Sequence, residues 1–219
     1  MTFDIKNTLD YLYNLQRLGI KVGLNQTNHF LSEIGDPQNN IRLAHVAGTN
    51  GKGSTCKMIS NILIEHGLKT GLYTSPHLLK FNERIKINGE DISNSSITNF
   101  IYNNKEKIDR IRTTFFETTT AMAFDYFYRE KIDFGVIETG LGGRLDSTNV
   151  ISPEVCCITS ISLDHTDILG NTIKKITNEK AGIIKENTPL VTFDQGPEIM
   201  NIIKEKSKIY NSQLTIVNP

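Results

Sequence analysis

Residues 45–55 carry the side chains of a phosphate-binding loop in the order that such a loop requires. An apolar stretch leads into Gly48 and Gly51, Lys52 follows, and Ser54 begins a helical pattern. Glycines allow successive backbone N–H groups to face one anion, and the helix N-terminus adds about half a positive charge. Lys52 would neutralise the outer phosphates as a mobile point charge. The segment therefore predicts triphosphate binding; the alternative is a glycine-rich turn without a ligand.

The spacing in this loop differs from that of an ordinary P-loop, GxxxxGK followed by Ser or Thr. Gly48 lies only three residues before Gly51, and Gly53 takes the place of the hydroxyl residue that binds the metal ion. These differences disfavour a generic P-loop kinase or GTPase. The sequence of residues 48–54, Gly-Thr-Asn-Gly-Lys-Gly-Ser, resembles the corresponding motif of the Mur ligase superfamily. The glycine after the lysine resembles the motif of the folate branch of that superfamily.

Further segments also resemble the folate branch, which comprises dihydrofolate synthases and folylpolyglutamate synthases. They are residues 74–77, 81–85, 114–117, 138–149, 162–165 and 179–183. Each segment alone is a weak or moderate indication. Because they follow one another in the family's order, the chain is identified by resemblance as a member of that family.

The resemblance implies an ATP-dependent amide ligase. In such an enzyme the carboxylate of dihydropteroate or folate takes the terminal phosphoryl group of ATP, and the amine of L-glutamate displaces phosphate from the resulting acyl phosphate. A carboxylate is a poor electrophile, whereas phosphate is a good leaving group. Because two anions must be held together, the reaction needs Mg²⁺ (two ions are expected) and Lys52 to reduce their repulsion.

The same resemblance assigns residues to ATP and to the metal. The matching ATP contacts are Thr49, Asn50, Gly51, Lys52, Gly53 and Ser54. Ser75, Glu138 and His165 match the Mg²⁺ ligands, and histidine is the less typical ligand because Mg²⁺ favours oxygen. On their own, Ser75 is equally well explained as a turn residue and Glu138 as a partly buried acid paired with an arginine. His165 is equally well explained as a loop residue bonded to backbone.

Lys180 matches a lysine that is often carbamylated in this family. A carbamate is carboxylate-like and can support a second metal ion, whereas an unmodified ammonium group cannot ligate a cation. We hypothesise a carbamate on Lys180, with a solvated helix lysine as the alternative. Lys52, Lys180 and His165 are the expected catalytic residues.

The pterin-bearing acid is expected to contact two segments that match the family, and an entry segment is a weaker candidate. The two segments contain Thr114, Phe115, Phe116 and Glu117, then Leu145, Asp146 and Ser147, and the entry segment contains Ile20, Lys21 and Val22. Phe115 and Phe116 would sandwich a planar ring, and Asp146 would accept its amino or amide hydrogen bonds. Arg84 would meet the anionic end of the substrate. Core packing of either phenylalanine, and a surface position for Arg84, remain equally open.

The elements that must position these residues form an alternating series. Strands are expected at residues 41–47, 71–74, 134–138, 155–160, 190–193 and 214–217, with a hairpin at residues 84–92 around Asn88-Gly89. Helices are expected at residues 27–34, 54–65, 96–112, 118–129, 172–184 and 197–210. The series predicts an α/β fold with a mainly parallel sheet flanked by helices, by resemblance a P-loop-containing Mur ligase central domain. Ser75, Glu138 and His165 would then gather at the carboxyl edge of the sheet.

The domain organisation is expected to be incomplete. Residues 1–38 form a helical lead-in and residues 39–219 an ATP-binding domain, whereas the family's C-terminal glutamate-ligase domain is expected to be absent. We therefore expect the chain alone to bind ATP weakly and not to turn over. Another Mur-type amide ligase and a non-catalytic nucleotide-binding remnant are the alternatives. The enzyme could synthesise dihydrofolate, extend polyglutamate chains or do both. The sequences at residues 114–117 and 142–146 resemble the bifunctional form, so we favour both activities.

Composition limits the partners and the location. The net charge is +0, so there is no basic field to attract nucleic acid or an anionic membrane. The three cysteines form neither a disulfide framework nor a zinc spacing, which fits a reducing cytoplasm. No apolar stretch approaches the roughly 18 residues of a spanning helix, and the N-terminus lacks the pattern of a signal peptide. We expect a cytoplasmic monomer whose partners are dihydropteroate or folate and L-glutamate.

Overall fold

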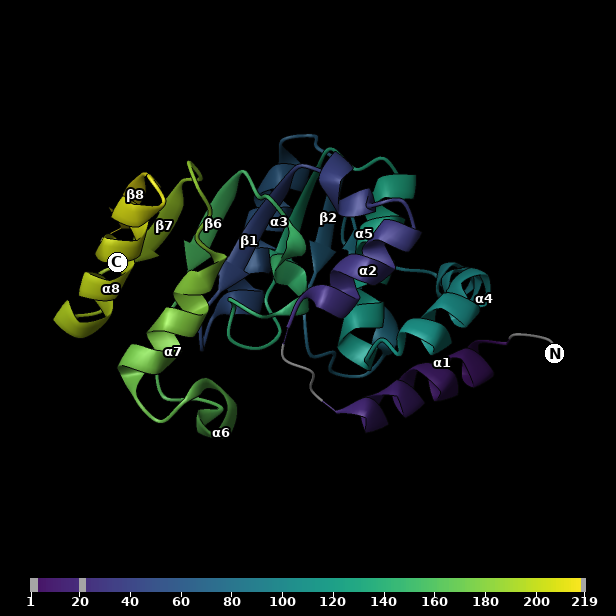
Figure 1. The fold of residues 1–219 in the computed structure, drawn as a ribbon. Coiled ribbons are helices and arrows are strands. Elements are labelled where there is room, and N and C mark those ends of the chain that lie inside the picture. Colours follow the sequence, from purple (N-terminus) through teal and green to yellow (C-terminus); the bar gives the residue numbers. More distant parts are fainter. Residues whose placement is uncertain (1–3, 20–22, 218–219) are drawn as a thin grey trace.

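A mostly parallel sheet forms the centre of the molecule, and the computed structural model describes residues 4–19 and 23–217 (Figure 1). The strand order is β4-β3-β2-β5-β1-β6-β7-β8. The strands are β1 (Leu43–Ala47), β2 (Thr70–Tyr73), β3 (Ile85–Ile87), β4 (Glu90–Asp91), β5 (Phe134–Glu138), β6 (Val155–Ile158), β7 (Leu190–Phe193) and β8 (Leu214–Val217). Neighbours from β2 to β8 pair in parallel, which confirms the predicted fold class.

The antiparallel edge of the sheet is the predicted hairpin. Strand β3 pairs with β2 and with β4 in antiparallel fashion. Asn88 and Gly89 join β3 to β4 with φ values of 50° and 83°. A type I′ turn requires positive φ at both central residues, so the Asn-Gly pair explains the position of this turn.

Helices lie on both faces of the sheet. They are α1 (Ile5–Asn14), α2 (Asn25–Glu33), α3 (Lys52–Glu65), α4 (Asn94–Ile111), α5 (Phe115–Arg129), α6 (Thr166–Leu169), α7 (Ile173–Lys180) and α8 (Pro197–Ile209). Short 3₁₀ helices are η1 (Leu15–Leu18), η2 (Pro37–Asn40), η3 (Phe81–Arg84), η4 (Ser147–Val150) and η5 (Ala181–Ile183). Figure 1 shows α7 and α8 beside β6–β8 at one end, and α1, α2 and α4 at the other.

Alternating side chains divide the core between the two faces of the sheet. On one face, Val46 packs with Cys56 of α3. On the other, Leu43 joins a cluster with α1, α2, α4 and α5, while Ile158 and Leu190 pack against α7 and α8. Each fully buried Val, Leu, Ile or Phe side chain contributes about 1.5–3 kcal/mol through the hydrophobic effect. This packing fixes the strand ends from which the candidate site is built.

Two of the helix boundaries that differ from the sequence prediction have local causes. Helix α5 begins at Phe115, because Thr114 caps it and Glu117 completes a capping box. The helix predicted at residues 172–184 ends at Lys180 and continues as the 3₁₀ turn η5. Both differences matter for function, since they place Thr114 and Lys180 at helix ends.

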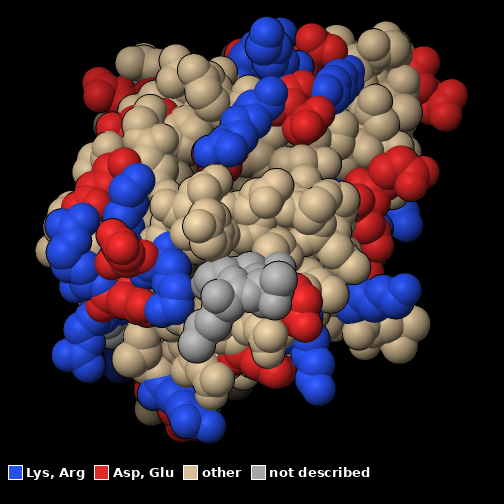
Figure 2. Space-filling view, turned by 90° about the vertical axis from the view of Figure 1, so that its right-hand side faces the viewer, with Lys and Arg blue, Asp and Glu red and all other residues tan. Residues whose placement is uncertain are grey.

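Charges of both signs share the surface. Figure 2, the side at the right of Figure 1, shows Lys and Arg interspersed with Asp and Glu around an uncharged centre. Exposed pairs such as Lys105–Asp109 on α4 join opposite charges, and each such pair contributes roughly 0–1 kcal/mol. Within the described ranges, no helix is long and apolar enough to cross a membrane.

Candidate active site

The phosphate loop joins β1 to α3 and depends on glycine at its first position. Gly48 has a φ of 151°, and a Cβ atom there would lie 1.8 Å from Oγ1 of Thr159. Gly51 caps α3 with a φ of 83°. Lys52 is the first residue of α3, and its Nζ donates to the carbonyl oxygen of Thr49 at 3.1 Å. The ammonium group therefore lies at the positive end of a helix, where an anion would be stabilised.

Glu138 ends β5 beside this loop. Its side chain is buried, and Oε2 accepts a hydrogen bond from the backbone N–H of Ser75 at 3.0 Å. A Cβ atom at Gly53 would lie 3.4 Å from the same Oε2 atom, so the glycine lets the carboxylate lie against the first turn of α3. Burial raises the pKa of Glu138, while the N–H of Ser75 and the charge of Lys52 act in the opposite direction. No salt bridge in the described part of the chain joins Glu138 to an arginine, which removes the alternative explanation of this residue.

Glu138 and the adjacent Ser75 carry side-chain oxygen atoms, the type of ligand that Mg²⁺ favours. Ser75 and His165 line one cavity together with Lys52, whereas Glu138 is not among the described residues that line it. His165 caps α6 with a φ of 45°, and its side chain is exposed. The described residues contain no cluster of three or more His, Cys, Asp or Glu side chains that could hold a metal. Mg²⁺ commonly uses one or two carboxylates and keeps several waters, so a buried carboxylate beside a hydroxyl group fits this ion.

Lys180 contacts the loop between β1 and α3. Its side chain is 2% exposed, and Nζ donates to the carbonyl oxygen of Gly48 at 2.8 Å. Burial and the charge of Lys52 lower the pKa of Lys180 to about 8. The alternative of a solvated helix lysine is therefore wrong. A large fraction of this amine is neutral near pH 8, as reaction with an electrophile requires.

One cavity of about 600 Å³ is lined by ten of the predicted residues. The predicted residues that are described but do not line it are Thr49, Asn50, Gly51, Gly53, Ser54, Glu117, Glu138 and Lys180. The lining residues that the sequence predicted are Lys52, Ser75, Arg84, Thr114, Phe115, Phe116, Leu145, Asp146, Ser147 and His165. The lining residues that it missed are Gln16, Gly19, Pro76, Gly140, Leu141, Arg144, Ile168, Leu169 and Glu179. Lys52, predicted to bind phosphate, and the residues predicted to bind the pterin-bearing acid thus line the same cavity. Ile20, Lys21 and Val22 lie outside the described residues.

Arg84 is a buried cation in the wall of this cavity. It is 7% exposed, which contradicts a surface position. Its Nε donates to Nδ1 of His77 at 2.7 Å, and its guanidinium carbon lies 5.2 Å from the ring centre of Phe115. Burial and the charge of Arg84 lower the pKa of His77, and its Nδ1 atom accepts the hydrogen bond from Arg84. No carboxylate in the described residues forms a salt bridge with Arg84, and a buried charge without a counter-ion favours an anionic ligand.

The two phenylalanines are partly core residues. Phe115 stacks on Tyr13 with ring centres 5.8 Å apart, and Arg84 lies over its ring. Phe116 lies 6.2 Å from Tyr73 in a tilted arrangement and is less buried than Phe115. Because Phe115 is already stacked, the two rings do not form an open sandwich. Both rings line the cavity, and Phe116 is the more exposed of the two.

Asp146 and Glu117, the two acidic residues predicted to bind the pterin-bearing substrate, accept hydrogen bonds from backbone N–H groups of the protein itself. Asp146 accepts hydrogen bonds from the backbone N–H groups of Leu141 and Thr148 at 2.7 and 3.0 Å. Glu117 is 2% exposed, accepts from the N–H of Thr114 at 2.7 Å and does not line the cavity. The signal for Glu117 was readable, since Thr-x-x-Glu is a capping box. Glu117 caps the N-terminus of α5. Asp146 stabilises its own loop through these hydrogen bonds and also lines the cavity.

A salt bridge that the sequence did not predict forms another part of the wall. Arg144 donates to Oε1 of Glu179 at 2.8 Å, and its backbone N–H donates to the carbonyl oxygen of Glu179 at 2.8 Å. Both residues belong to segments that carry the family resemblance, but they are 35 positions apart in the chain. Their salt bridge could not be predicted from the sequence and is visible only in the folded chain.

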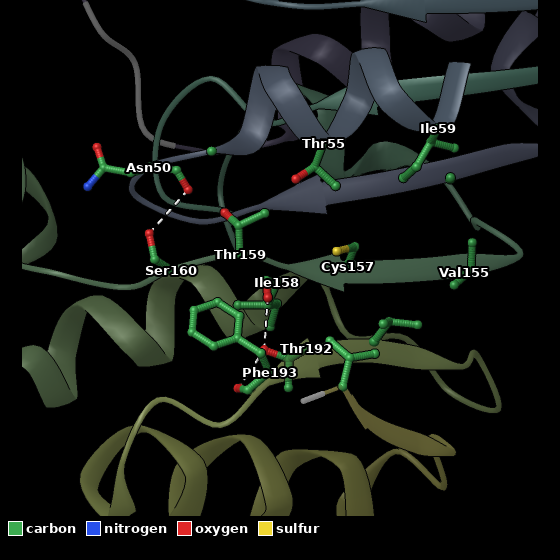
Figure 3. Close-up of a pocket in the computed structure, with 14 residues that line it drawn as sticks. Asn50, Thr55, Ile59, Val155, Cys157, Ile158, Thr159, Ser160, Thr192 and Phe193 are labelled. Carbon is green, nitrogen blue, oxygen red and sulfur yellow. Dashed lines mark hydrogen bonds between the residues drawn. The ribbon is translucent and has the colours of Figure 1, made fainter. Parts of the chain in front are cut away.

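A second cavity, of about 590 Å³, lies on the other side of the phosphate loop (Figure 3). Asn50, Gly51 and Thr55 form one end of it. Most of the remaining lining residues belong to β6, β7, β8 and the segment after β6, with Ala44 of β1 and Ile59 of α3. Two predicted ATP contacts, Asn50 and Gly51, therefore border this cavity.

Comparison with known proteins places the chain among related sequences. A family profile described as the Mur ligase middle domain matches residues 46–216. The dihydrofolate synthase/folylpolyglutamate synthase of Bacillus subtilis (strain 168) is 44% identical over 205 residues, which are 90% of this chain and 48% of that protein. The dihydrofolate synthetase of Saccharomyces cerevisiae is 41% identical over 208 residues, 92% of this chain and 49% of that protein.

A solved structure is similar over nearly the whole chain. An FPGS–AMPPCP–folate complex has a TM-score of 0.90 at 36% identity, and the match covers 97% of this chain and 54% of that chain. The chain therefore spans about half the length of the relatives it matches.

Proposed function

Because the chain belongs to the Mur ligase middle-domain family, we propose that it is the ATP- and acid-binding part of an ATP-dependent acid–amino-acid ligase. The whole protein would join L-glutamate to dihydropteroate or to folates. The observation that carries this proposal is the shared cavity, which has Lys52 of the phosphate loop and the buried cation Arg84 in its lining. A relative named for this activity and a solved complex containing folate support it.

Each side chain has a defined task in the proposed reaction. Lys52 and the N-terminus of α3 hold the outer phosphates of ATP, while Arg84 orients the anionic acid substrate. A carboxylate oxygen of the acid attacks the γ-phosphorus, the bond to the β-phosphate oxygen breaks, and ADP leaves. The glutamate amine then attacks the acyl carbon, loses a proton and expels phosphate. Ser75, Glu138 and His165 would hold Mg²⁺, which supplies positive charge to the phosphates.

The finer assignments are part of the same proposal. The relatives named above include a bifunctional enzyme and a dihydrofolate synthetase, and we favour the bifunctional activity. A domain beyond residues 39–219 would complete the glutamate site. We place the protein in the cytoplasm as a monomer, and its three cysteines are all free thiols, as in a reducing compartment.

Calorimetric titration tests the proposal. Mg²⁺ with AMPPCP, a non-hydrolysable analogue of ATP, is titrated first, and dihydropteroate or folate second. Lys52→Ala is expected to weaken the nucleotide affinity about ten- to a hundredfold, because it removes a charged hydrogen-bond donor worth about 1.5–3 kcal/mol. Lys57→Ala, at an exposed position of the same helix, is the matched control. Absence of nucleotide binding by the wild type, or equal affinities for both variants, would refute the proposal.

A further inference from the structure

Gln195 joins the loop after β7 to the segment that follows β6. Its Oε1 accepts from the N–H of Ile161 at 2.8 Å, and its Nε2 donates to the carbonyl oxygen of Thr159 at 3.0 Å. The same Nε2 donates to Oγ1 of Thr192 at 3.1 Å. Both the oxygen and the nitrogen of the Gln195 amide therefore form hydrogen bonds, and they fix the backbone at Thr159 and at Ile161.

The opposite side of that segment holds the phosphate loop. The N–H of Thr49 donates to the carbonyl oxygen of Ser160 at 2.6 Å, and Oγ1 of Thr49 donates to the carbonyl oxygen of Ser162 at 3.1 Å. Ser160 donates its hydroxyl to the carbonyl oxygen of Asn50 at 3.2 Å, and Figure 3 shows these two residues facing each other. The phosphate loop is thus supported through residues 159–162, which Gln195 supports in turn.

We propose that Gln195 is a positioning residue for the phosphate loop, acting through the backbone of residues 159–162. The inference rests on the proposed function, because it assigns the loop to a nucleotide. An amide is required at this position, since the site needs an acceptor for Ile161 and a donor for Thr159 in one planar group. A carboxylate supplies only the acceptor and would place its second oxygen against a carbonyl oxygen.

Matched variants separate loss of the donor from gain of charge. Gln195→Glu keeps the shape, and Gln195→Met keeps the length but neither donates nor accepts strongly. Gln213→Glu makes the same charge change at an exposed glutamine and is the control. Both Gln195 variants are expected to weaken Mg²⁺–AMPPCP binding about tenfold, the effect of about 1.4 kcal/mol. Folate affinity is expected to stay within about twofold of wild type.

Hydrogen exchange provides a readout that needs no ligand. The amides of Thr49 and Ser162 are expected to exchange faster in both Gln195 variants than in Gln213→Glu, whereas the amides of β2 and β5 keep their wild-type rates. Unchanged exchange at Thr49 overturns the proposal, as does weakened nucleotide binding in Gln195→Glu but not in Gln195→Met. If the wild type binds no nucleotide, the proposed function fails, and the exchange rates alone decide whether Gln195 supports the loop.

Discussion

The Nζ atom of Lys180 lies 2.8 Å from the carbonyl oxygen of Gly48, although 132 positions separate the two residues in the chain. Gly48 begins the phosphate loop, and Lys180 ends α7. The contact brings a buried amine to the loop that carries Lys52, and the two like charges disfavour each other. A negative modification of Lys180 would relieve this repulsion.

The first prediction is therefore a carbamate on Lys180. Carbamylation joins a neutral amine to CO₂ with loss of a proton, and a pKa of about 8 makes the neutral amine abundant at mildly alkaline pH. We expect a carbamate carbon signal in NMR spectra recorded with ¹³C-bicarbonate near pH 8. The signal should disappear in Lys180→Ala and persist in Lys185→Ala, which removes another lysine whose pKa burial lowers. Identical spectra for wild type and Lys180→Ala would contradict the carbamate.

The second prediction concerns the charge of Arg84. Arg84→Met is expected to weaken dihydropteroate or folate binding about ten- to a hundredfold, because a charged hydrogen bond is worth about 1.5–3 kcal/mol. Arg84→Lys should restore only part of the affinity, since an ammonium group lacks the planar fork of the guanidinium. Nucleotide affinity should not change. Calorimetry on these variants and on Arg129→Met, an exposed control, checks the prediction; a loss of equal size in the control would exclude a specific role.

The third prediction is a pH dependence of stability caused by His45. His45 is fully buried in β1, Nε2 lies 2.8 Å from Oγ1 of Thr148, and burial together with the charge of Lys185 lowers its pKa to about 3. Below about pH 6.5 the unfolded chain therefore binds a proton that the folded chain does not, so stability falls as the pH falls. This residue alone should cost about 2 kcal/mol between pH 7 and pH 5.

Urea unfolding at both pH values measures this effect. His45→Gln should lose this part of the pH dependence, whereas His66→Gln, at an exposed histidine, should retain it. A pH dependence in His45→Gln equal to that of the wild type would show that other groups cause it.

The fourth prediction separates structure from binding at Glu117. Glu117→Ala leaves the buried N–H of Thr114 without its carboxylate partner, so the free energy of unfolding should fall by about 1–3 kcal/mol. Glu117→Gln should retain much of the stability, because glutamine also completes a capping box. Folate affinity should remain within about twofold in both variants if they are folded. A Glu117→Gln variant of normal stability that fails to bind folate would show direct substrate contact.

Local signals explain why much of this site was predictable. Gly48, Gly51 and Lys52 lie within five consecutive positions of the chain, and glycines before a lysine at a helix start are a local signal for an anion-binding turn. Ser75 and Glu138 could be assigned to one edge because parallel strands present their carboxyl ends together. The hairpin at Asn88 had an equally local cause.

Contacts between distant segments explain what was not predictable. Glu138 has no arginine partner among the described residues, whereas Arg84 is buried against His77 and Phe115. Residue type alone predicts neither that Glu138 lacks an arginine partner nor that Arg84 is buried. Gln195 carries no motif, and its role is visible only where two loops meet.

The alternation of strands and helices, the phosphate loop and the family resemblance were all readable in the sequence, because residue spacing and backbone propensity act over short distances. The folded structure was needed to show which side chains line one cavity, that Arg144 pairs with Glu179, and that Lys180 reaches Gly48. Burial and charge pairing depend on packing between segments far apart in the chain, so these properties exist only once the chain has folded.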